Sequence, residues 1–329
     1  MPDNPILRRL VTVPTAFLLF LVITGLSPLL LLLASAIDLF RSLTRDRPWM
    51  AVRSLAFLWV YLLGQMWALL GLLFSAPVPK ESKLRITFDL QSAWTGWNLA
   101  ALRRIFSLDL VVEGQGSARN GPIVLLCRHA SIVDTMLPAG LVARPFRIRL
   151  RYVLKRELLI DPTLDIGGNR LPNYFVDRAS GDSAAELGAI RELARDLDDD
   201  EGVLIYPEGT RFSEEKREVY TGRLAREPGV VGQVSARLRR VLPPRPGGTL
   251  AILDASTADV VILAHHGLEG LATVRDIWEG GLVGSRIRVR LWRIPRESIP
   301  TGRSERVDWL FSVWAAVDEW VVAQSEGDG

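Results

Sequence analysis

Residues that could remove a proton from a substrate are few, because the chain contains three histidines. His129 follows a short apolar run, and Asp134 stands five positions later. An imidazole that acts as a base needs a carboxylate on its other nitrogen, which fixes the tautomer and stabilises the imidazolium. On a regular helix, residues five apart point about 140° away from each other. The pair can therefore meet only if His129 precedes the first helical turn and the chain bends before Asp134.

No nucleophile motif accompanies this pair. The Gly-x-Ser-x-Gly pattern of serine hydrolases is absent, and Cys127 lies within a predicted strand. A base without a nucleophile of its own suits a reaction in which a substrate hydroxyl attacks an activated carbonyl. General-base catalysis contributes about 10²–10⁴-fold to such a step.

A second constellation follows another apolar run, at Pro207-Glu208-Gly209-Thr210-Arg211. Glycine lets the backbone approach a ligand closely, threonine offers a hydroxyl, and arginine can bind a phosphate through two parallel hydrogen bonds. Taken alone, the motif is also compatible with a plain turn. Two charged clusters lie between the motifs along the chain, and each alone is typical of a solvated surface: Lys155-Arg156-Glu157-Leu158 and Phe175-Val176-Asp177-Arg178.

In this order, the motifs resemble the glycerolipid acyltransferase family, whose best-known members are the lysophosphatidic acid acyltransferases. The family's patterns are His-x4-Asp, Lys-x-Glu-Leu, Phe-[Ile/Val]-Asp-Arg and Pro-Glu-Gly-Thr-Arg. They match, in turn, His129 with Asp134, Lys155 to Leu158, Phe175 to Arg178, and Pro207 to Arg211. The resemblance covers about residues 100–265, and the apolar N-terminal segments are also similar to the membrane helices of the family.

The resemblance implies a role for each matched residue. His129 would be the base on the free hydroxyl of the acceptor, and Asp134 would orient it. The phosphate of a lysolipid would be held by Glu208, Gly209, Thr210 and Arg211, with help from Lys155 and Arg178. The acyl donor would be a thioester of coenzyme A or of acyl carrier protein, used as a co-substrate, and the chemistry requires neither a metal nor a cofactor.

The activity implied is transfer of a fatty acyl group to a lysophospholipid, foremost 1-acyl-glycerol-3-phosphate, which would make phosphatidic acid. The expected partners are the lysolipid, the acyl donor and the bilayer, with no nucleic acid. Two alternatives remain open: coenzyme A-independent transacylation between phospholipids, and a catalytically silent lipid-binding or scaffold protein. The intact His129–Asp134 pair argues against the silent protein, since such a homologue has no physical reason to retain a base and its orienter.

Two further segments bear on the resemblance. Pro244-Arg245-Pro246-Gly247-Gly248 resembles a branch with lysocardiolipin-type and lysophosphatidylinositol-type enzymes. The fourth motif of the family is an apolar strand that ends in a proline, whereas here Val260 to Ala264 leads into His265 and His266. We expect these two histidines to form a loop, the alternative being a second polar element near the site.

Short apolar runs alternate with helical patterns after Pro79, which predicts an α/β fold with a mixed sheet flanked by helices. The predicted strands are Leu108–Glu113, Ile123–Cys127, Phe146–Val153, Tyr174–Val176, Gly202–Tyr206, Val260–Ala264 and Arg286–Ile294. The predicted helices are Phe88–Phe106, Ser131–Val142, Ser183–Leu197, Val230–Leu242 and Val307–Val322, the last with Leu310, Phe311, Trp314, Val317 and Val321 on one face.

The N-terminal part is distinctly apolar. Leu10–Ile37 carries no charge, and Ala56–Phe74 has only Tyr61 and Gln65 as distinctly polar residues; each run is long enough to cross a hydrocarbon core of ~30 Å. We expect a membrane-anchoring helical hairpin over 1–77 and a catalytic domain over 78–329. A cleavable signal peptide is the competitor, but its apolar core would span about 7–15 residues, fewer than this run contains.

The expected location is the bacterial inner membrane, with the catalytic domain on the cytoplasmic side, although the distribution of Arg and Lys around the hairpin does not decide its orientation. Composition agrees with a membrane-attached protein that has a core. Hydrophobic residues make up 48% of the chain and the net charge is +3, which argues against disorder. The single cysteine excludes an internal disulfide and a cysteine-built metal site.

Overall fold

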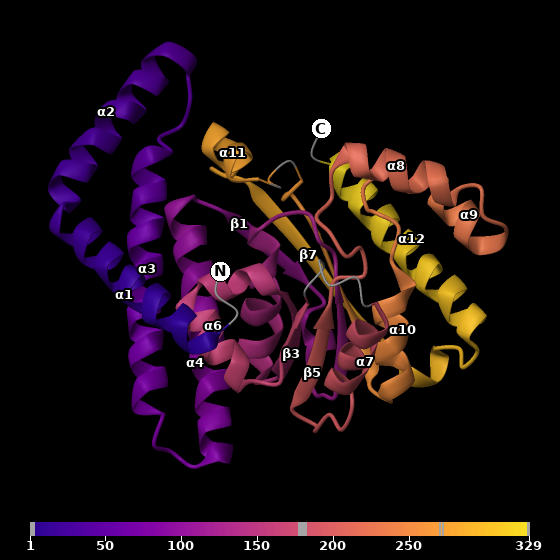
Figure 1. Ribbon diagram of the computed structural model, residues 1–329. Helices are drawn as coiled ribbons and strands as arrows, with labels where there is room; N and C mark the ends of the chain where they lie inside the picture. The colour runs from indigo at the N-terminus through magenta and orange to yellow at the C-terminus, as the bar shows by residue number, and fades with distance from the viewer. Residues whose placement is uncertain (1–3, 177–182, 270, 272, 328–329) are drawn as a thin grey trace. The chain divides into compact units, whose positions relative to one another are not determined.

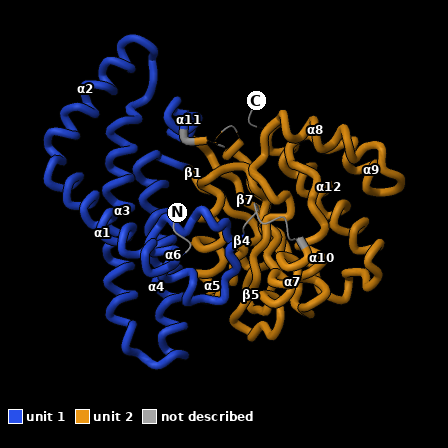
Figure 2. The backbone as a smooth tube through the Cα atoms, viewed as in Figure 1, with its two compact units in different colours: residues 1–108, 154–179, 275–284 blue, residues 109–153, 180–274, 285–329 orange. Residues whose placement is uncertain are grey.

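The computed structural model describes residues 4–176, 183–269, 271 and 273–327 (Figure 1). The chain divides into two compact units, coloured separately in Figure 2. Unit 1 comprises residues 1–108, 154–179 and 275–284, and unit 2 comprises residues 109–153, 180–274 and 285–329. The bounds of these units differ from the domain boundary expected after residue 77. That boundary stays a prediction about domain organisation.

Unit 1 begins with four long helices, α1 (Pro5–Gly25), α2 (Ser27–Arg45), α3 (Ala51–Phe74) and α4 (Lys80–Ile105). Within the described residues, α1, α2 and α3 are long and apolar enough to cross a membrane. The first apolar run, Leu10–Ile37, falls in two helices that meet at Leu26. Pro28 lies in the first turn of α2, where its missing N–H would have no helical partner in any case.

The two polar residues of the second apolar run both contact one carboxylate. Tyr61 donates a hydrogen bond from its hydroxyl to Asp161, and Gln65 Nε2 donates to Asp161 Oδ2 at 2.9 Å. Asp161 also caps helix α6 (Pro162–Arg170), because its Oδ1 accepts the amides of Thr163 and Leu164. The polar side chains of α3 therefore fasten this helix to α6 within unit 1.

A buried ion cluster joins the start of α1 to the same helix. Arg8 Nη2 lies 2.7 Å from Asp165 Oδ1, and Arg9 Nε lies 3.2 Å from Asp165 Oδ2. The side chain of Asp165 is completely buried. A buried carboxylate needs charged partners and hydrogen bonds to offset its lost hydration, and here both cations come from the first helix of the chain.

Unit 2 is built on a mixed sheet. Its strands follow the order β1-β7-β6-β2-β5-β3. Their bounds are β1 Asp109–Glu113, β2 Ile123–Cys127, β3 Arg149–Lys155, β5 Glu201–Ile205, β6 Asp259–His266 and β7 Arg286–Ile294. The last two residues of β3, and the short strand β4 (Tyr174–Val176), belong to unit 1. The predicted α/β class with a mixed sheet is confirmed.

The centre of the sheet sets up the site. β2 pairs in parallel with β5 on one side and β6 on the other, and every residue of β2 is buried. A continuous apolar run is typical of a parallel strand covered on both faces. Parallel strands end at the same edge of a sheet, where α/β proteins place functional groups. His129, Tyr206 and His265 all lie at this edge.

Helices of unit 2 confirm some predictions and correct others. Bounds are α5 Arg144–Phe146, α7 Ser183–Leu193, α8 Glu214–Leu224, α9 Gly229–Ser235, α10 Pro246–Ala255 and α12 Arg303–Gly327. The apolar stripe predicted for the last helix is buried on α12, which packs against β6. The predicted helix Ser131–Val142 is helical from Val133 onward but irregular, because it begins with a 3₁₀ turn at Val133–Met136 and continues through a π turn at Ala139–Ala143.

The predicted helix Val230–Leu242 is wrong in its second half. α9 ends at Ser235, and the amides of Arg239, Arg240 and Val241 donate to the carboxylate of Asp318 on α12 instead of to helical carbonyls. Neither α8 nor α10 is among the predicted helices. The remaining short elements are η1 Gln115–Ala118, η4 Arg156–Ile160, α11 Val274–Asp276, η5 Ile277–Gly281 and η6 Arg296–Ser298.

Candidate active site

His129 and Asp134 meet as the spacing requires. His129 Nδ1 lies 2.9 Å from Asp134 Oδ1. His129 comes two residues after the end of β2 and precedes the 3₁₀ turn that contains Asp134, so the chain bends between them. Since Nδ1 faces the carboxylate, Nε2 is the nitrogen left for a substrate proton. The hydrogen is assigned to Nδ1 because the neighbouring Asp134 oxygen can only accept.

The second oxygen of Asp134 holds the bend itself. Oδ2 accepts the amide of Ala130 at 2.6 Å and that of Ser131 at 2.7 Å. Burial of this carboxyl raises its pKa, but hydrogen bonds from His129 and His265 outweigh burial and hold the pKa of Asp134 well below its usual value. Asp134 is therefore a fixed anion that faces the imidazole.

The imidazole of His129 is largely enclosed. About 12% of its side chain is exposed, and its ring centroid lies 4.6 Å from that of Tyr206, with 38° between the ring planes. The backbone carbonyl of His129 accepts the amide of Phe212 at 2.8 Å. These contacts join the end of β2 to the segment after β5, which carries the second motif.

The second motif forms a tight turn after β5. Gly209 adopts φ of +67°, and a Cβ at this position would lie 3.0 Å from Arg245 Cδ, so glycine is required both for the conformation and for the close packing. Lys216 Nζ donates to Thr210 Oγ1 at 3.2 Å and to the carbonyl of Arg211 at 3.0 Å. Thr210 and Arg211 are half-buried, so the turn presents hydroxyl and guanidinium groups on a braced backbone.

Glu208 differs from the expectation for a phosphate-binding residue. Its side chain is completely buried, and its two oxygens accept the amides of His129 at 3.1 Å and Leu242 at 3.3 Å. Burial raises the pKa of Glu208 to about 8, although these amides and the nearby Arg128 favour the charged form. In this geometry the carboxyl ties three loops together and does not point toward a ligand.

Several residues of the site carry no signal in the sequence. The guanidinium of Arg128 is fully buried and forms an ion pair with Glu269, and it donates to the carbonyls of His265 and Arg240, each at 2.5 Å. His265 lies on β6 beside Asp134, so the expectation of a histidine loop is wrong. Each contact joins residues more than 100 positions apart, and only the adjacency of the strands β2 and β6 could have indicated them.

Two predicted residues fall outside this geometry. Lys155 ends β3 and belongs to unit 1, which is described separately from the unit that holds His129. Arg178 lies outside the described residues. The part of the chain that the structure describes contains no cluster of three or more His, Cys, Asp or Glu side chains arranged to hold a metal ion.

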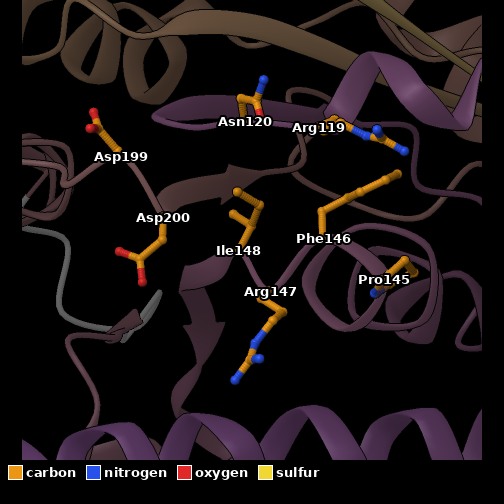
Figure 3. Close-up of a pocket in the computed structure, with 8 residues that line it drawn as sticks. All are labelled: Arg119, Asn120, Pro145, Phe146, Arg147, Ile148, Asp199 and Asp200. Carbon is orange, nitrogen blue, oxygen red and sulfur yellow. The ribbon is translucent and has the colours of Figure 1, made fainter.

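A pocket of about 430 Å³ opens at the opposite edge of the sheet, near the amino ends of β2, β3 and β5 (Figure 3). Figure 3 shows Asp199 and Asp200 on one side of it and Arg119 with Phe146 on the other. The guanidinium of Arg119 lies 5.8 Å from the ring centroid of Phe146. This pocket contains none of the residues of the two motifs, so we do not assign it to the acyl-transfer chemistry.

Comparison with known proteins agrees with the motifs. A family model described as Acyltransferase matches residues 109–264. The matched residues include both His129 and Arg211, and the resemblance to PlsC-like glycerolipid acyltransferases is confirmed.

The fold of the chain has a counterpart among solved structures. It is similar to the crystal structure of PlsC from Thermotoga maritima, a 1-acyl-sn-glycerophosphate (LPA) acyltransferase. The TM-score is 0.55 at 15% sequence identity, and the match covers 82% of this chain and 95% of that one. No curated protein matches the chain by sequence.

Proposed function

We propose that this acyltransferase transfers a fatty acyl group from a thioester of coenzyme A or acyl carrier protein to the free hydroxyl of a lysophospholipid, foremost 1-acyl-glycerol-3-phosphate. The observation that carries the proposal is the contact of 2.9 Å between His129 Nδ1 and Asp134 Oδ1. It lies at the sheet edge that also bears the Pro207–Arg211 turn, inside the family-matching residues.

The reaction follows from the geometry of the pair. His129 Nε2 takes the proton of the acceptor hydroxyl as its oxygen attacks the thioester carbonyl. Asp134 stabilises the imidazolium that forms. The carbon–sulfur bond then breaks, the new ester remains, and the leaving thiolate receives the proton from His129. Every proton is accounted for by one imidazole, and the acceptor oxygen is the nucleophile.

Acceptor binding is assigned to the turn after β5. Arg211 can bind a phosphate through its guanidinium, Thr210 offers a hydroxyl, and Gly209 lets the backbone approach. We assign Glu208 to bracing the turn, because both its oxygens are engaged by amides. Lys155 and Arg178 are proposed to assist with the phosphate on the strength of the family resemblance.

The protein is further proposed to be integral to a membrane, with α1, α2 and α3 as its anchor. Their length and hydropathy support this, as do the exposed large apolar side chains that run along them. A lysolipid acceptor is itself resident in a bilayer, so anchoring keeps the protein in the same membrane as its substrate. The bacterial inner membrane, with catalysis on the cytoplasmic side, is the proposed location.

A direct test is to incubate the purified full-length protein with acyl-coenzyme A and lysophosphatidic acid while following thiol release. Release that depends on the lysolipid is the expected result, and His129→Ala should lower it by about 10²-fold or more. Lipid remodelling without thiol release would instead favour transacylation between phospholipids. Absence of both reactions, with either thioester carrier, would favour a silent lipid-binding protein.

A further inference from the structure

His265 is a buried titratable side chain that the proposed reaction does not use. It is the penultimate residue of β6 and its side chain is completely buried. β6 pairs in parallel with β2, and Cys127 lies opposite Leu263 in the register. The strands therefore carry His265 and His129 to the same edge of the sheet, although the two residues are far apart in sequence.

The ring nitrogens of His265 have unequal surroundings. Nε2 lies 3.1 Å from the carbonyl oxygen of Arg128 and 3.4 Å from Asp134 Oδ2. Both neighbours are acceptors, so Nε2 carries the hydrogen. Nδ1 is buried and has no hydrogen-bond partner among the described residues. A neutral ring protonated on Nε2 leaves an unpaired acceptor at Nδ1, whereas a cationic ring would leave an unpaired buried donor beside Arg128.

Asp134 thus lies between two imidazoles. Oδ1 faces His129 Nδ1 at 2.9 Å, and Oδ2, already bonded to the amides of Ala130 and Ser131, faces His265 at 3.4 Å. A carboxylate that has a donor on each side can rotate little. Each donor also withdraws negative charge from the oxygen that His129 needs, because hydrogen bonds to a carboxylate lower its basicity.

We propose that His265 is a positioning residue, which shares its Nε2 hydrogen between the Arg128 carbonyl and Asp134 and thereby fixes the carboxylate that orients His129. The proposal rests on the proposed function for its kinetic readout. It assigns His265 no contact with substrate.

Other titratable groups and one guanidinium surround the pair and stay the same in the variants below. The guanidinium of Arg128 follows β2, Glu269 follows β6 and pairs with that guanidinium, and Glu208 follows β5 and binds the His129 amide. His266 contacts Glu269 at 3.4 Å. Because β6 points successive side chains to opposite faces, His266 lies on the other face of the strand and supplies a matched control.

The test replaces His265 by leucine, glutamine or asparagine. Leucine removes the donor. The side-chain nitrogen of glutamine is separated from Cα by the same number of bonds as Nε2 of histidine. The side-chain nitrogen of asparagine is one bond closer to Cα. For His265→Leu we expect kcat to fall roughly tenfold or more, the effect of a lost hydrogen bond to a charged group, while KM for both substrates stays unchanged. His265→Gln should recover most of kcat and His265→Asn should not.

The pH profile separates positioning from packing. Without the His265 donor, the Asp134 oxygens keep more negative charge, and this makes the His129 imidazole more basic. The acidic limb of the kcat/KM profile should therefore move to higher pH in His265→Leu. In His265→Gln the limb should return to its wild-type position. A purely structural role would lower the amount of active enzyme and leave the limb in place. If His265→Leu does not fold, the glutamine and asparagine variants carry the same comparison.

A second readout needs no turnover. The chain has three histidines, so ¹⁵N spectra of the imidazoles in detergent can follow each ring through a titration. The titration of His129 should shift upward in His265→Leu relative to the wild type and to His266→Gln. An unshifted His129, or a kcat loss that glutamine does not rescue, would overturn the proposal. If His265→Leu shifts the titration of His129 but the wild-type protein transfers no acyl group, the proposed function alone is refuted.

Discussion

Asp134 is completely buried, and yet it remains an anion because donors surround both its oxygens. A buried carboxylate costs several kcal/mol unless it is hydrogen-bonded and faces a positive partner. Two backbone amides and two imidazoles provide this here. The same arrangement selects the tautomer of His129, so one residue stabilises the bend and prepares the base.

The pattern of donors predicts the effect of Asp134→Asn. The amides of Ala130 and Ser131 require an oxygen at the position of Oδ2, so the new NH₂ group would face His129 Nδ1. The ring would then accept at Nδ1 and carry its hydrogen on Nε2, the wrong tautomer for a base. We expect kcat to fall by about 10²–10⁴-fold, measured by steady-state thiol release, with a thermal midpoint close to that of the wild type. Activity within a few-fold of wild type would contradict the orienting role.

Arg211 gives a second prediction at this scale. Replacing it with alanine removes a guanidinium that can bind a phosphate bidentately, so KM for lysophosphatidic acid should rise about tenfold or more, as for the loss of a charge-assisted hydrogen bond. KM for the acyl donor should stay nearly constant. The exposed Arg226, also in unit 2, offers a control substitution of the same charge. Equal kinetics for both alanine variants would remove Arg211 from acceptor binding.

Loops hold this site together through side-chain carboxyl groups that accept hydrogen bonds from backbone amides. Glu208 binds the amides of His129 and Leu242, and Asp318 on α12 binds three successive amides at 239–241. Irregular segments leave their N–H groups without helical or sheet partners, so a side-chain acceptor must satisfy them. The loops around His129 are therefore each hydrogen-bonded to a side chain from another segment of the chain.

The Glu208 bridge has a consequence for stability. Its pKa is about 8 in the folded protein, raised by burial from an ordinary 4.5. Between these values the unfolded chain loses the proton first, so the free energy of unfolding falls as pH rises through this window, by a few kcal/mol. Glu208→Gln cannot ionise, so the fall in thermal midpoint between pH 5 and pH 8 should be smaller in that variant. If the thermal midpoint falls equally with pH in the variant and in the wild type, the pKa of Glu208 is not raised in the folded protein.

Sequence reasoning reached the strands more accurately than the helices near the site. The bounds of β2 and β7 agree with prediction to the residue, because apolar runs between turn residues are a local signal. The segment from Ser131 to Val142 has helical periodicity, but Asp134 bonds backward to two amides and produces a 3₁₀ turn. His265 and Arg128 were missed for a further reason: their contacts depend on which strands become neighbours, and that pairing is not written in any short stretch of sequence.

The chain as a whole combines a sheet that carries the proposed active site with three helices that have the length and hydropathy of membrane spans. Large apolar side chains such as Leu32, Leu43 and Phe74 are exposed along these helices. Apolar patches of this extent are rare on soluble monomers. Lipid contact explains them economically, and it agrees with an acceptor that is itself a lipid.

An integral membrane anchor determines in which cell fraction the protein is found. After expression, it should remain in the membrane pellet through washes with high salt and with alkaline carbonate, and it should be released by detergent. Electrostatic attachment alone would be screened by salt. Release of the protein by either wash would contradict an integral anchor. If a fragment without helices α1, α2 and α3 also stayed in the pellet after the carbonate wash, the pellet would consist of aggregated protein.

The ion cluster between Arg8, Arg9 and Asp165 bears on protein export. Ala34-Ser35-Ala36 has the form of a leader-peptidase recognition sequence, and cleavage there would carry both arginines away. Asp165 would then lose both of the arginines that pair with it. We therefore expect helix α1 to remain in the mature polypeptide, and amino-terminal sequencing of the purified protein should find the residues that precede Arg8.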